Sequence, residues 1–118
     1  MILVDTSVWI DHLRKGNGRL ANLLQNFSVF VHPFVIGELA CGNLRNRKKI
    51  LQLLERLPGA NMASDSEVLY FIEKNKLAGR GIGYVDAHLL AAAALTPDAQ
   101  LWTRDRRLES IAKDMGLA

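Results

Sequence analysis

The chain has 118 residues, of which 49% are hydrophobic, enough to fill the core of one domain without disulfide bonds. Cys41 is the only cysteine, which excludes an intrachain disulfide and favours a reducing compartment. No basic segment followed by a long apolar stretch opens the sequence, and the longest later apolar run, residues 89–95, is far too short to span a membrane. We therefore expect a single domain over residues 1–118, soluble and cytoplasmic.

The first segment predicts a strand that ends at an acid. Residues 1–4 form an apolar run too short for a helix, and Asp5 follows it directly. Thr6 or Ser7 is a suitable N-cap for a helix over residues 8–14, where apolar side chains recur at helical spacing. Ligands of open α/β sheets bind at the carboxyl ends of strands, so Asp5 is a candidate functional carboxylate, with an ordinary helix cap as the alternative.

Short apolar runs alternate with helical patterns along the rest of the chain. Further strands are expected at residues 28–31 and 100–103, with a weak one at 60–63. Further helices are expected from residue 20 to about 26, over 34–44 after Pro33, over 45–57, from the Ser64 capping box to Gly79, from Tyr84 onward and after Asp105. No hairpin dipeptide joins two strand candidates, so the pattern predicts an α/β fold with a parallel sheet covered on both faces.

Four carboxylates lie at positions where a charged side chain is expected to have a binding partner or a functional role. These are Asp5 and Asp105, which each follow a predicted strand, Asp86, which opens a helix after a glycine-rich loop, and Glu38, which lies inside a helix. Apolar neighbours surround Glu38, so we expect it to be buried, where an unpaired charge costs on the order of several kcal/mol. The remaining acids lie in polar, cap or turn settings typical of a solvated surface, apart from Asp11, which is intermediate.

These acids lie in four segments: VDTSVWID at 4–11, IGELACG at 36–42, GYVDAHLLAAAAL at 83–95 and LWTRDRRL at 101–108. In order and spacing the segments resemble the four acidic motifs of the PIN-domain family, in particular the VapC toxins of toxin–antitoxin pairs. The resemblance implies a metal-dependent ribonuclease on a three-layer α/β/α sandwich with a mostly parallel sheet of four or five short strands. It also implies a catalytic and metal-binding cluster of Asp5, Glu38, Asp86 and Asp105, assisted by the hydroxyls of Thr6, Ser7 and Thr103. A final edge strand is expected to be very short or absent, because few residues follow the last helix.

Four clustered carboxylates favour a hard divalent cation. Like charges about 4 Å apart repel by roughly 4 kcal/mol at an effective dielectric of about 20. Mg²⁺ prefers oxygen ligands and removes this repulsion, and Mn²⁺ is expected to substitute. The histidines and the cysteine share no zinc-ligand spacing, and His88 is turned about 200° around the helix from Asp86. We expect a cation-activated water to attack a phosphodiester, with Asp5 and Asp86 as the strongest ligands, Glu38 placing the water or a ligand, and Asp105 tuning the cluster.

The net charge of +3 comes from 15 basic and 12 acidic side chains, so setting the four clustered acids aside leaves 15 basic against eight acidic groups on the remaining surface. Such a surface can hold a nucleic acid backbone. The main candidates for RNA contact are Arg80, Arg104 and Arg106, followed by Arg14, Lys15, Arg19, Arg107 and the basic cluster at 45–49. Trp9 and Trp102 fit the core or an interface better than base stacking. The expected partners are an RNA substrate and, from the resemblance, a cognate antitoxin protein and a second copy in a homodimer.

Two other classes of protein, and one other nuclease within the same class, remain open. A receiver-like signalling domain also gathers acids at strand ends, but it requires a lysine after a late strand, where this chain has Arg104 and Asp105. A PIN-fold module that binds RNA or a partner without cutting would usually have lost one of the acids, and all four are present. A housekeeping PIN nuclease is the third, and such proteins tend to be longer than this chain.

Overall fold

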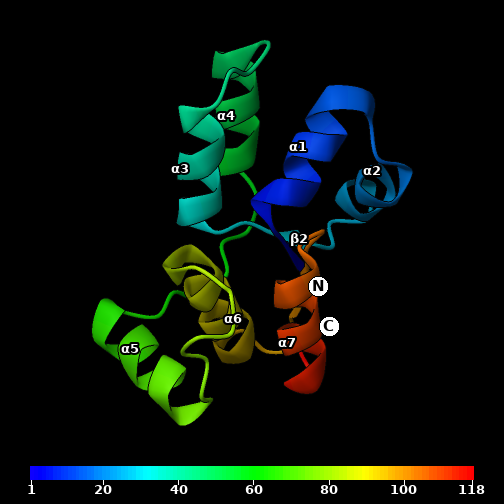
Figure 1. Cartoon of the computed structure of the whole chain (residues 1–118). Coiled ribbons are helices and arrows are strands. Elements are labelled where there is room, and N and C mark those ends of the chain that lie inside the picture. Colours follow the sequence, from blue (N-terminus) through cyan, green and yellow to red (C-terminus); the bar gives the residue numbers. More distant parts are fainter.

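The computed structural model describes all 118 residues and contains seven helices around a three-stranded sheet (Figure 1). In chain order the elements are β1 (Ile2–Val4), α1 (Thr6–Lys15), α2 (Gly18–Gln25), β2 (Val29–Phe30), α3 (Pro33–Cys41), α4 (Arg47–Glu55), α5 (Asp65–Lys74), α6 (Tyr84–Leu95), β3 (Gln100–Trp102) and α7 (Arg106–Asp114). The fold is therefore α/β, as the alternation of apolar runs and helical patterns predicts. No helix is both long enough and apolar enough to cross a membrane.

The strands are all parallel and lie in the order β2-β1-β3, with β1 in the centre. Ile2 pairs with Val29 on one side and with Gln100 on the other. Leu3 and Val4 are fully buried, which explains why the chain opens with an uninterrupted apolar run. Because the carboxyl ends of parallel strands meet at one edge of the sheet, the residues that follow β1 and β3 are brought side by side.

The sheet has three strands, fewer than the four or five expected. The weak strand predicted at 60–63 does not form, and the only pairing in this region is a single bridge between Val31 and Gly59. Beyond the bridge, the Asn61 N–H donates to the Thr96 hydroxyl at 2.9 Å. This segment leaves the sheet because its backbone groups bond to the end of α6 instead of to a strand.

The C-terminal tail makes only one bond to the sheet. The Leu101 N–H donates to the Leu117 carbonyl at 2.6 Å, and the Leu117 N–H donates to the Ala112 carbonyl at 2.7 Å. The tail therefore folds back on α7 and forms no strand, in agreement with the expectation of a very short or absent edge strand.

Helices α3 and α4 are both shorter than predicted. The Arg47 guanidinium donates to the carbonyls of Ala40 and Gly42, which occupies acceptors that the end of α3 leaves unpaired. Asn46 has a left-handed backbone with φ of 52°, and α4 begins after it. One arginine of the basic cluster at 45–49 thus closes the preceding helix.

The capping box predicted at the start of α5 is present. The Ser64 hydroxyl accepts from the Glu67 N–H at 3.2 Å, and the Glu67 carboxylate accepts from the Ser64 N–H at 2.9 Å. The helix ends at Lys74 rather than at Gly79, because the backbone turns into the left-handed region at Lys76, with φ of 53°.

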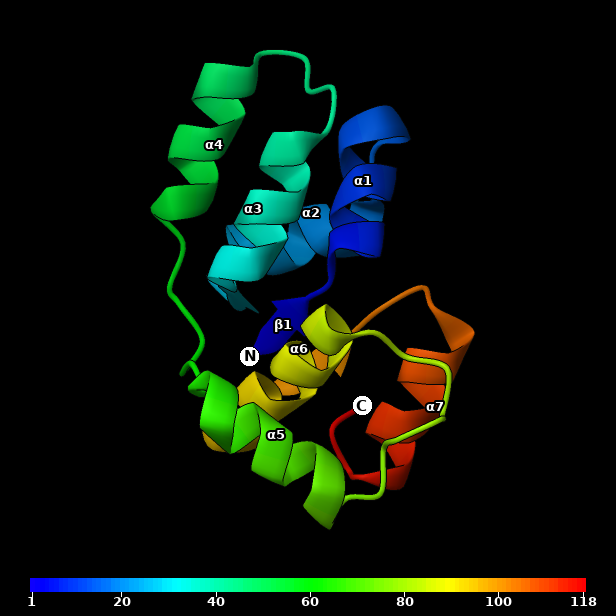
Figure 2. The same cartoon turned by 60° about the vertical axis from the view of Figure 1, so that its left-hand side comes forward.

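Helices lie on both sides of the small sheet, and Figure 2 shows α6 in front of β1 and α2 behind α3. They form two groups, with α1 to α4 above and α5 to α7 below in both ribbon views (Figures 1 and 2). One hydrophobic cluster joins the groups through buried residues of β1, α2, α3, α6 and α7, among them Leu3, Leu20, Leu39, Leu90 and Ile111. The carboxyl edge of the sheet is therefore reached by elements of both groups.

Candidate active site

Asp5 is held at the junction of β1 and α1 by three hydrogen bonds. Its carboxylate accepts from the Thr6 N–H at 2.7 Å, from the Ser7 hydroxyl at 3.0 Å and from the Thr103 hydroxyl at 2.7 Å. Asp5 is 7% exposed and is itself the N-cap of α1. The prediction that Thr6 or Ser7 caps this helix is therefore wrong, because the acid caps the helix and the neighbouring residues donate to the acid. Three donors fix the orientation of a buried carboxylate.

Asp105 follows β3, the strand beside β1, and joins the same network. One of its oxygens accepts from the N–H groups of Arg107 and Leu108, at 2.9 and 3.0 Å, and caps α7. The Asp105 N–H donates to the Thr103 hydroxyl at 3.0 Å, and that hydroxyl donates to Asp5. A single buried side chain, Thr103, therefore links the two acids that follow β1 and β3.

Glu38 reaches the site from α3 and is exposed, so the prediction that it is buried is wrong. Val35 and Leu39 take the inward face of α3, with exposures of 0% and 2%, which leaves Glu38 on the flank of the helix. There its carboxylate accepts from the Thr6 hydroxyl at 2.6 Å. Thr6 thus connects Glu38 to Asp5, because its hydroxyl donates to Glu38 and its N–H donates to Asp5, and α3 is held at the site.

Asp86 lies half-buried in the first turn of α6, where its carboxylate accepts from the Gly83 N–H at 3.0 Å. Burial raises the pKa of the Asp86 carboxyl above its ordinary value, and the negative charges of Asp5, Asp105 and Glu38 raise it further, against the opposing effect of the Gly83 bond. The structure therefore brings together the four acids predicted from separate motifs, close enough for their charges to act on Asp86.

The donor atoms of this cluster are all carboxylate oxygens, which suits a hard divalent cation such as Mg²⁺. No three acidic, histidine or cysteine side chains converge closely enough to enclose an ion directly. Asp86, Asp105 and Glu38 nevertheless each keep one oxygen free of protein hydrogen bonds, and Mg²⁺ commonly retains several waters. The arrangement fits a cation that is held partly through water.

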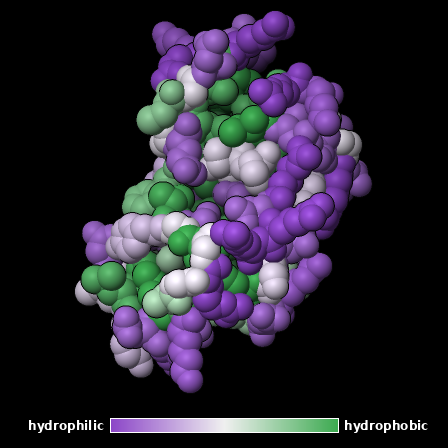
Figure 3. All heavy atoms as spheres, in the orientation of Figure 1, coloured by the Kyte–Doolittle hydropathy of each residue, from purple (hydrophilic) through white to green (hydrophobic).

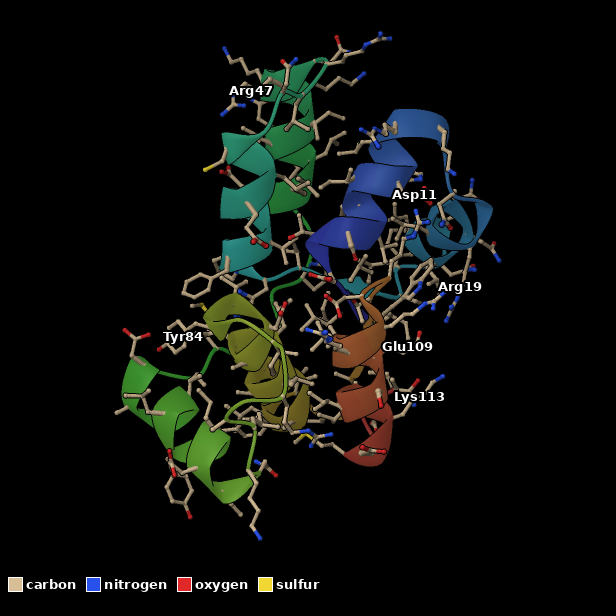
Figure 4. The ribbon with its side chains drawn as sticks, viewed as in Figure 1. Asp11, Arg19, Arg47, Tyr84, Glu109 and Lys113 are labelled. Atoms are coloured by element: carbon tan, nitrogen blue, oxygen red, sulfur yellow. The ribbon has the colours of Figure 1, made fainter.

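Arg104 lies at the edge of this cluster and is held by an acid outside it. Its backbone N–H donates to the Ser7 hydroxyl at 3.0 Å, and its guanidinium lies 2.6 Å from the carboxylate of Asp11. Figure 4 shows where Asp11 lies on α1. A hydrogen bond from Asn17, together with the charges and hydrogen bonding of Lys15 and Arg104, lowers the pKa of Asp11 against the effect of burial. Asp11 thus remains a charged anchor for a cation beside the site.

The other arginines predicted to contact RNA lie in different places. Arg106 is exposed on the first turn of α7, directly after Asp105. Arg80 pairs at 3.5 Å with Asp114, at the opposite end of α7 from the acids. Arg107 lies over the loop before α6, and a methyl group added at Gly81 would stand 2.7 Å from its Cδ and Nη1 atoms. Arg107 therefore bridges α7 and the loop that leads to Asp86.

The two tryptophans do not offer open stacking surfaces. Trp9 is 4% exposed and belongs to the core. Trp102 is half-buried, and the Arg19 guanidinium lies 4.3 Å from the centre of its ring. Figure 4 shows Arg19 reaching from α2 toward the sheet. The preference for core or interface over base stacking agrees with both positions.

A groove of about 660 Å³ opens between α1, α3 and α4, with Glu38 at its margin. Figure 3 shows it as a hollow with a green, apolar floor ringed by purple atoms near the top of the molecule. The apolar lining residues are Ile10, Leu13, Leu39, Leu44 and Ile50, and the basic ones are Arg14 and Arg45. The groove therefore offers an apolar surface with positive charge beside the acidic cluster.

A buried polar cluster beside the acids has no counterpart among the predictions from the sequence. His32 and His88 are 0% and 1% exposed. His88 lies 3.2 Å from Asp65, and the Tyr84 hydroxyl donates to the same carboxylate oxygen at 2.8 Å. The expectation that His88 faces away from Asp86 is thus confirmed. The one available signal was the proline after His32, because a residue before an initial helix proline is in the N-cap position.

Comparison with known proteins assigns the chain to a protein family. The family model described as PIN domain matches residues 2–114. The chain therefore belongs to the PIN-domain family, as its four acidic motifs suggested.

Within this family the chain is similar to named ribonucleases. It is 47% identical over 118 residues to proteins named Ribonuclease VapC32 from Mycobacterium tuberculosis strain CDC 1551 / Oshkosh and strain ATCC 25618 / H37Rv. The alignment covers 100% of this chain and 95% of each relative.

Asp86 should make the metal-free protein less stable as the pH rises. Its raised pKa means that the folded state holds this proton more tightly than the unfolded chain, so ionisation above the ordinary value of 3.8 disfavours folding. We expect the free energy of unfolding of wild type to fall relative to that of Asp86→Asn as the pH rises from about 4, where the unfolded carboxyl ionises, until the folded carboxyl has ionised as well. Urea unfolding in chelator measures this difference.

The comparison with Asp86→Asn is needed because other acids act in the opposite direction. Hydrogen bonds from Asn17 and Ser64 lower the pKa values of Asp11 and Glu67, and both proteins contain these acids. Parallel stability curves in chelator would contradict the raised pKa of Asp86.

Proposed function

We propose that this protein is a metal-dependent endoribonuclease that hydrolyses RNA phosphodiester bonds, as a single nuclease domain over residues 1–118, and acts as the toxin of a VapBC-type toxin–antitoxin pair. The observation that carries the proposal is the gathering of Asp5, Glu38, Asp86 and Asp105 at one edge of the sheet, where burial and then the charges of the other three acids raise the pKa of Asp86. The identity of 47% with proteins named Ribonuclease VapC32 supports the same reaction.

A divalent cation is the proposed cofactor, Mg²⁺ with Mn²⁺ as a substitute. Asp5 and Asp86 would hold it most strongly, and Asp105 would contribute its free oxygen through water. When bound, such a cation neutralises negative charge at the scissile phosphate and makes a nearby water more acidic.

The side chains around the cation site have separate roles in this proposal. Glu38, exposed and held by the Thr6 hydroxyl, would orient the attacking water and accept its proton. The hydroxyls of Ser7 and Thr103 keep Asp5 in place. The water oxygen forms a bond to phosphorus as the bond to the opposite sugar oxygen breaks, and the leaving oxygen takes up a proton from solvent.

The RNA backbone would lie along the arginines nearest the acids. Arg104 and Arg106 flank Asp105 in the sequence, and Arg107 reaches the loop before α6. Arg80, at the far end of α7, would contact a more distant part of the RNA.

The toxin role implies a protein partner and a setting. A cognate antitoxin would neutralise the enzyme, and an apolar antitoxin segment fits the groove between α1, α3 and α4. We also propose a homodimer and a cytoplasmic location, where RNA substrates are present.

Cleavage of a structured RNA pool by the purified protein tests the nuclease. Discrete fragments should form with Mg²⁺ or Mn²⁺ and should disappear with chelator and with Asp86→Asn. Expression in a bacterial host should arrest growth, and co-expression of the antitoxin should relieve the arrest. RNA binding without cleavage in any metal would point to a non-catalytic PIN module. Cleavage without growth arrest would point to a housekeeping PIN nuclease.

The Gly81→Ala variant tests the position of Arg107. A methyl group at Gly81 would force the Arg107 side chain to move, and Gly79→Ala is the matched control because nothing lies within 4 Å of its added methyl group. Both glycines have positive φ, 74° at Gly79 and 81° at Gly81, so both substitutions carry a similar backbone strain of about 1 kcal/mol.

We expect Gly81→Ala to weaken RNA binding about fivefold relative to Gly79→Ala, because one charge-assisted phosphate contact is displaced. Binding is measured in the Asp86→Asn background, so that no RNA is cut. Arg107→Gln should reproduce the loss. Equal affinities of the Gly81→Ala and Gly79→Ala proteins would remove Arg107 from the RNA surface.

A further inference from the structure

His32 is a buried hydrogen-bond donor without an acceptor. It is the N-cap of α3, and its Nδ1 accepts from the Phe34 N–H at 3.0 Å. An imidazole nitrogen that accepts carries no proton. Burial, reinforced by His88, lowers the pKa of His32 to about 4, so the ring is neutral near pH 7. Its proton is then on Nε2, which is buried and has no partner in the protein.

His88 leaves an acceptor unpaired, whereas His32 leaves a donor unpaired. Its Nε2 lies 3.2 Å from the Asp65 carboxylate, which also accepts from Tyr84, and Figure 4 shows Tyr84 between α6 and α5. A carboxylate only accepts, so the Nε2 of His88 carries the proton. In the neutral ring Nδ1 is then an acceptor, and this atom is also buried without a partner.

The unpaired donor of His32 and the unpaired acceptor of His88 belong to neighbouring rings. The ring centroids are 6.2 Å apart, and the Phe34 ring packs against both, at 5.1 and 4.5 Å. A ring nitrogen stands about 1.2 Å from its centroid, so the two atoms are at least about 4 Å apart, which is too far for a direct hydrogen bond. One bridging water joins ring nitrogens up to about 6 Å apart, twice the length of a hydrogen bond, and neighbouring rings at this centroid separation can meet that condition.

We propose that one buried water accepts from the His32 Nε2–H and donates to the His88 Nδ1, and so links α3 to α6. Buried waters commonly satisfy polar groups that the protein leaves unpaired. The resulting chain runs from the Phe34 N–H through both rings to Asp65, where the Tyr84 hydroxyl also bonds. The tautomer of each ring is set by the bond on its other side, so the chain has a consistent direction.

The link joins two helices that carry site acids. Glu38 lies on α3, which His32 caps, and Asp86 lies on α6, two residues before His88. Resting on the proposed nuclease function, the link sets the spacing between Glu38 and Asp86. Both histidines are positioning residues, because their rings bond to Phe34 and Asp65 and to none of the four site acids. The hydrogen-bonded link itself does not depend on that function.

Two variants cut the link from opposite sides and keep each residue's other bond. His32→Asn retains an acceptor for the Phe34 N–H, since Asn is a favoured N-cap, and loses the Nε2 donor. His88→Gln retains a donor to Asp65 and loses the Nδ1 acceptor. His12→Asn is the control, because the His12 ring bonds only to the Asn17 N–H in the α1–α2 region.

Each linking variant should raise the Mn²⁺ concentration for half-maximal RNA cleavage about tenfold, with an unchanged KM for RNA. The double variant should be no worse than either single one, because both remove the same interaction. The His12→Asn protein should match wild type. Losses that multiply in the double variant would overturn the link.

Long-range proton–nitrogen correlation spectra of the metal-free protein near neutral pH test the link without any nuclease activity. Both His32 and His88 should carry their proton on Nε2, and a proton on Nδ1 of either ring would overturn the proposal. If wild type cuts no RNA, that result contradicts the proposed nuclease function and not the link between the two histidines. The link is then decided by these spectra and by the unfolding equilibrium constants of the same variants. The double variant should again be no less stable than either single variant.

Discussion

The Asp86→Asn protein should cleave RNA at least about a thousandfold more slowly than wild type and yet be equally or more stable near neutral pH. Loss of the proposed cation ligand should remove several kcal/mol of transition-state stabilisation, on the order of a thousandfold in rate. The Asn side chain keeps an oxygen that accepts from the Gly83 N–H, so the start of α6 is preserved. It also removes a negative charge whose burial, close to three other acids, opposes folding. Initial cleavage rates in saturating Mn²⁺ and urea unfolding in chelator measure the two effects.

The matched control for this variant is Asp98→Asn. Asp98 is exposed in the turn before β3 and has φ of 59°, a conformation that Asn tolerates well. The same chemical change there should alter neither cleavage nor stability. An Asp86→Asn protein with wild-type cleavage, or with clearly lower stability than wild type, would contradict the role assigned to Asp86.

The Asp5→Ala protein, in contrast, should lose both cleavage and stability. Alanine removes the N-cap of α1 and leaves the Ser7 and Thr103 hydroxyls without their acceptor in a buried site. We expect the free energy of unfolding to fall by about 2 to 4 kcal/mol, from the lost cap and the unpaired hydroxyls together. Urea unfolding in chelator and cleavage assays in Mn²⁺ give the two values.

Two further variants separate the structural effect of Asp5 from its chemical effect. Asp5→Asn retains one acceptor, so it should be intermediate in stability and as inactive as Asp5→Ala. Ser64→Ala removes an exposed cap, at α5, and should cost only about 1 kcal/mol with cleavage unchanged. If Asp5→Ala is no less stable than Ser64→Ala, the hydrogen bonds around Asp5 do not contribute as proposed.

The contrast between these two acids follows from how the site is held together. None of the salt bridges in the protein involves Asp5, Glu38, Asp86 or Asp105. Their partners are hydroxyls and backbone N–H groups, which orient carboxylates without cancelling their charge. The negative charge therefore remains available to a cation, and the proposed metal dependence is the chemical consequence.

The motifs themselves could be located from the sequence because they depend on neighbouring residues. The apolar run before Asp5, the glycine-rich loop before Asp86 and the strand before Asp105 each predict where an element starts or ends. Parallel strands then place the acids after β1 and β3 at one edge, a consequence of topology that needs no side-chain detail.

The exposure of Glu38, the distance of Arg80 from the acids and the meeting of His32 with His88 were decided only by the tertiary structure. Local spacing sets the face of a helix on which a side chain lies, but the neighbouring elements determine whether that face is covered. On α3 the buried face includes Leu39, whereas Glu38 lies on the flank of the helix, where it is exposed to solvent and accepts from the Thr6 hydroxyl. The two histidines come from helices far apart in the sequence, so only the packing of α3 against α6 makes them neighbours. The sequence determined which acids this protein has, and the fold determined what holds them in place.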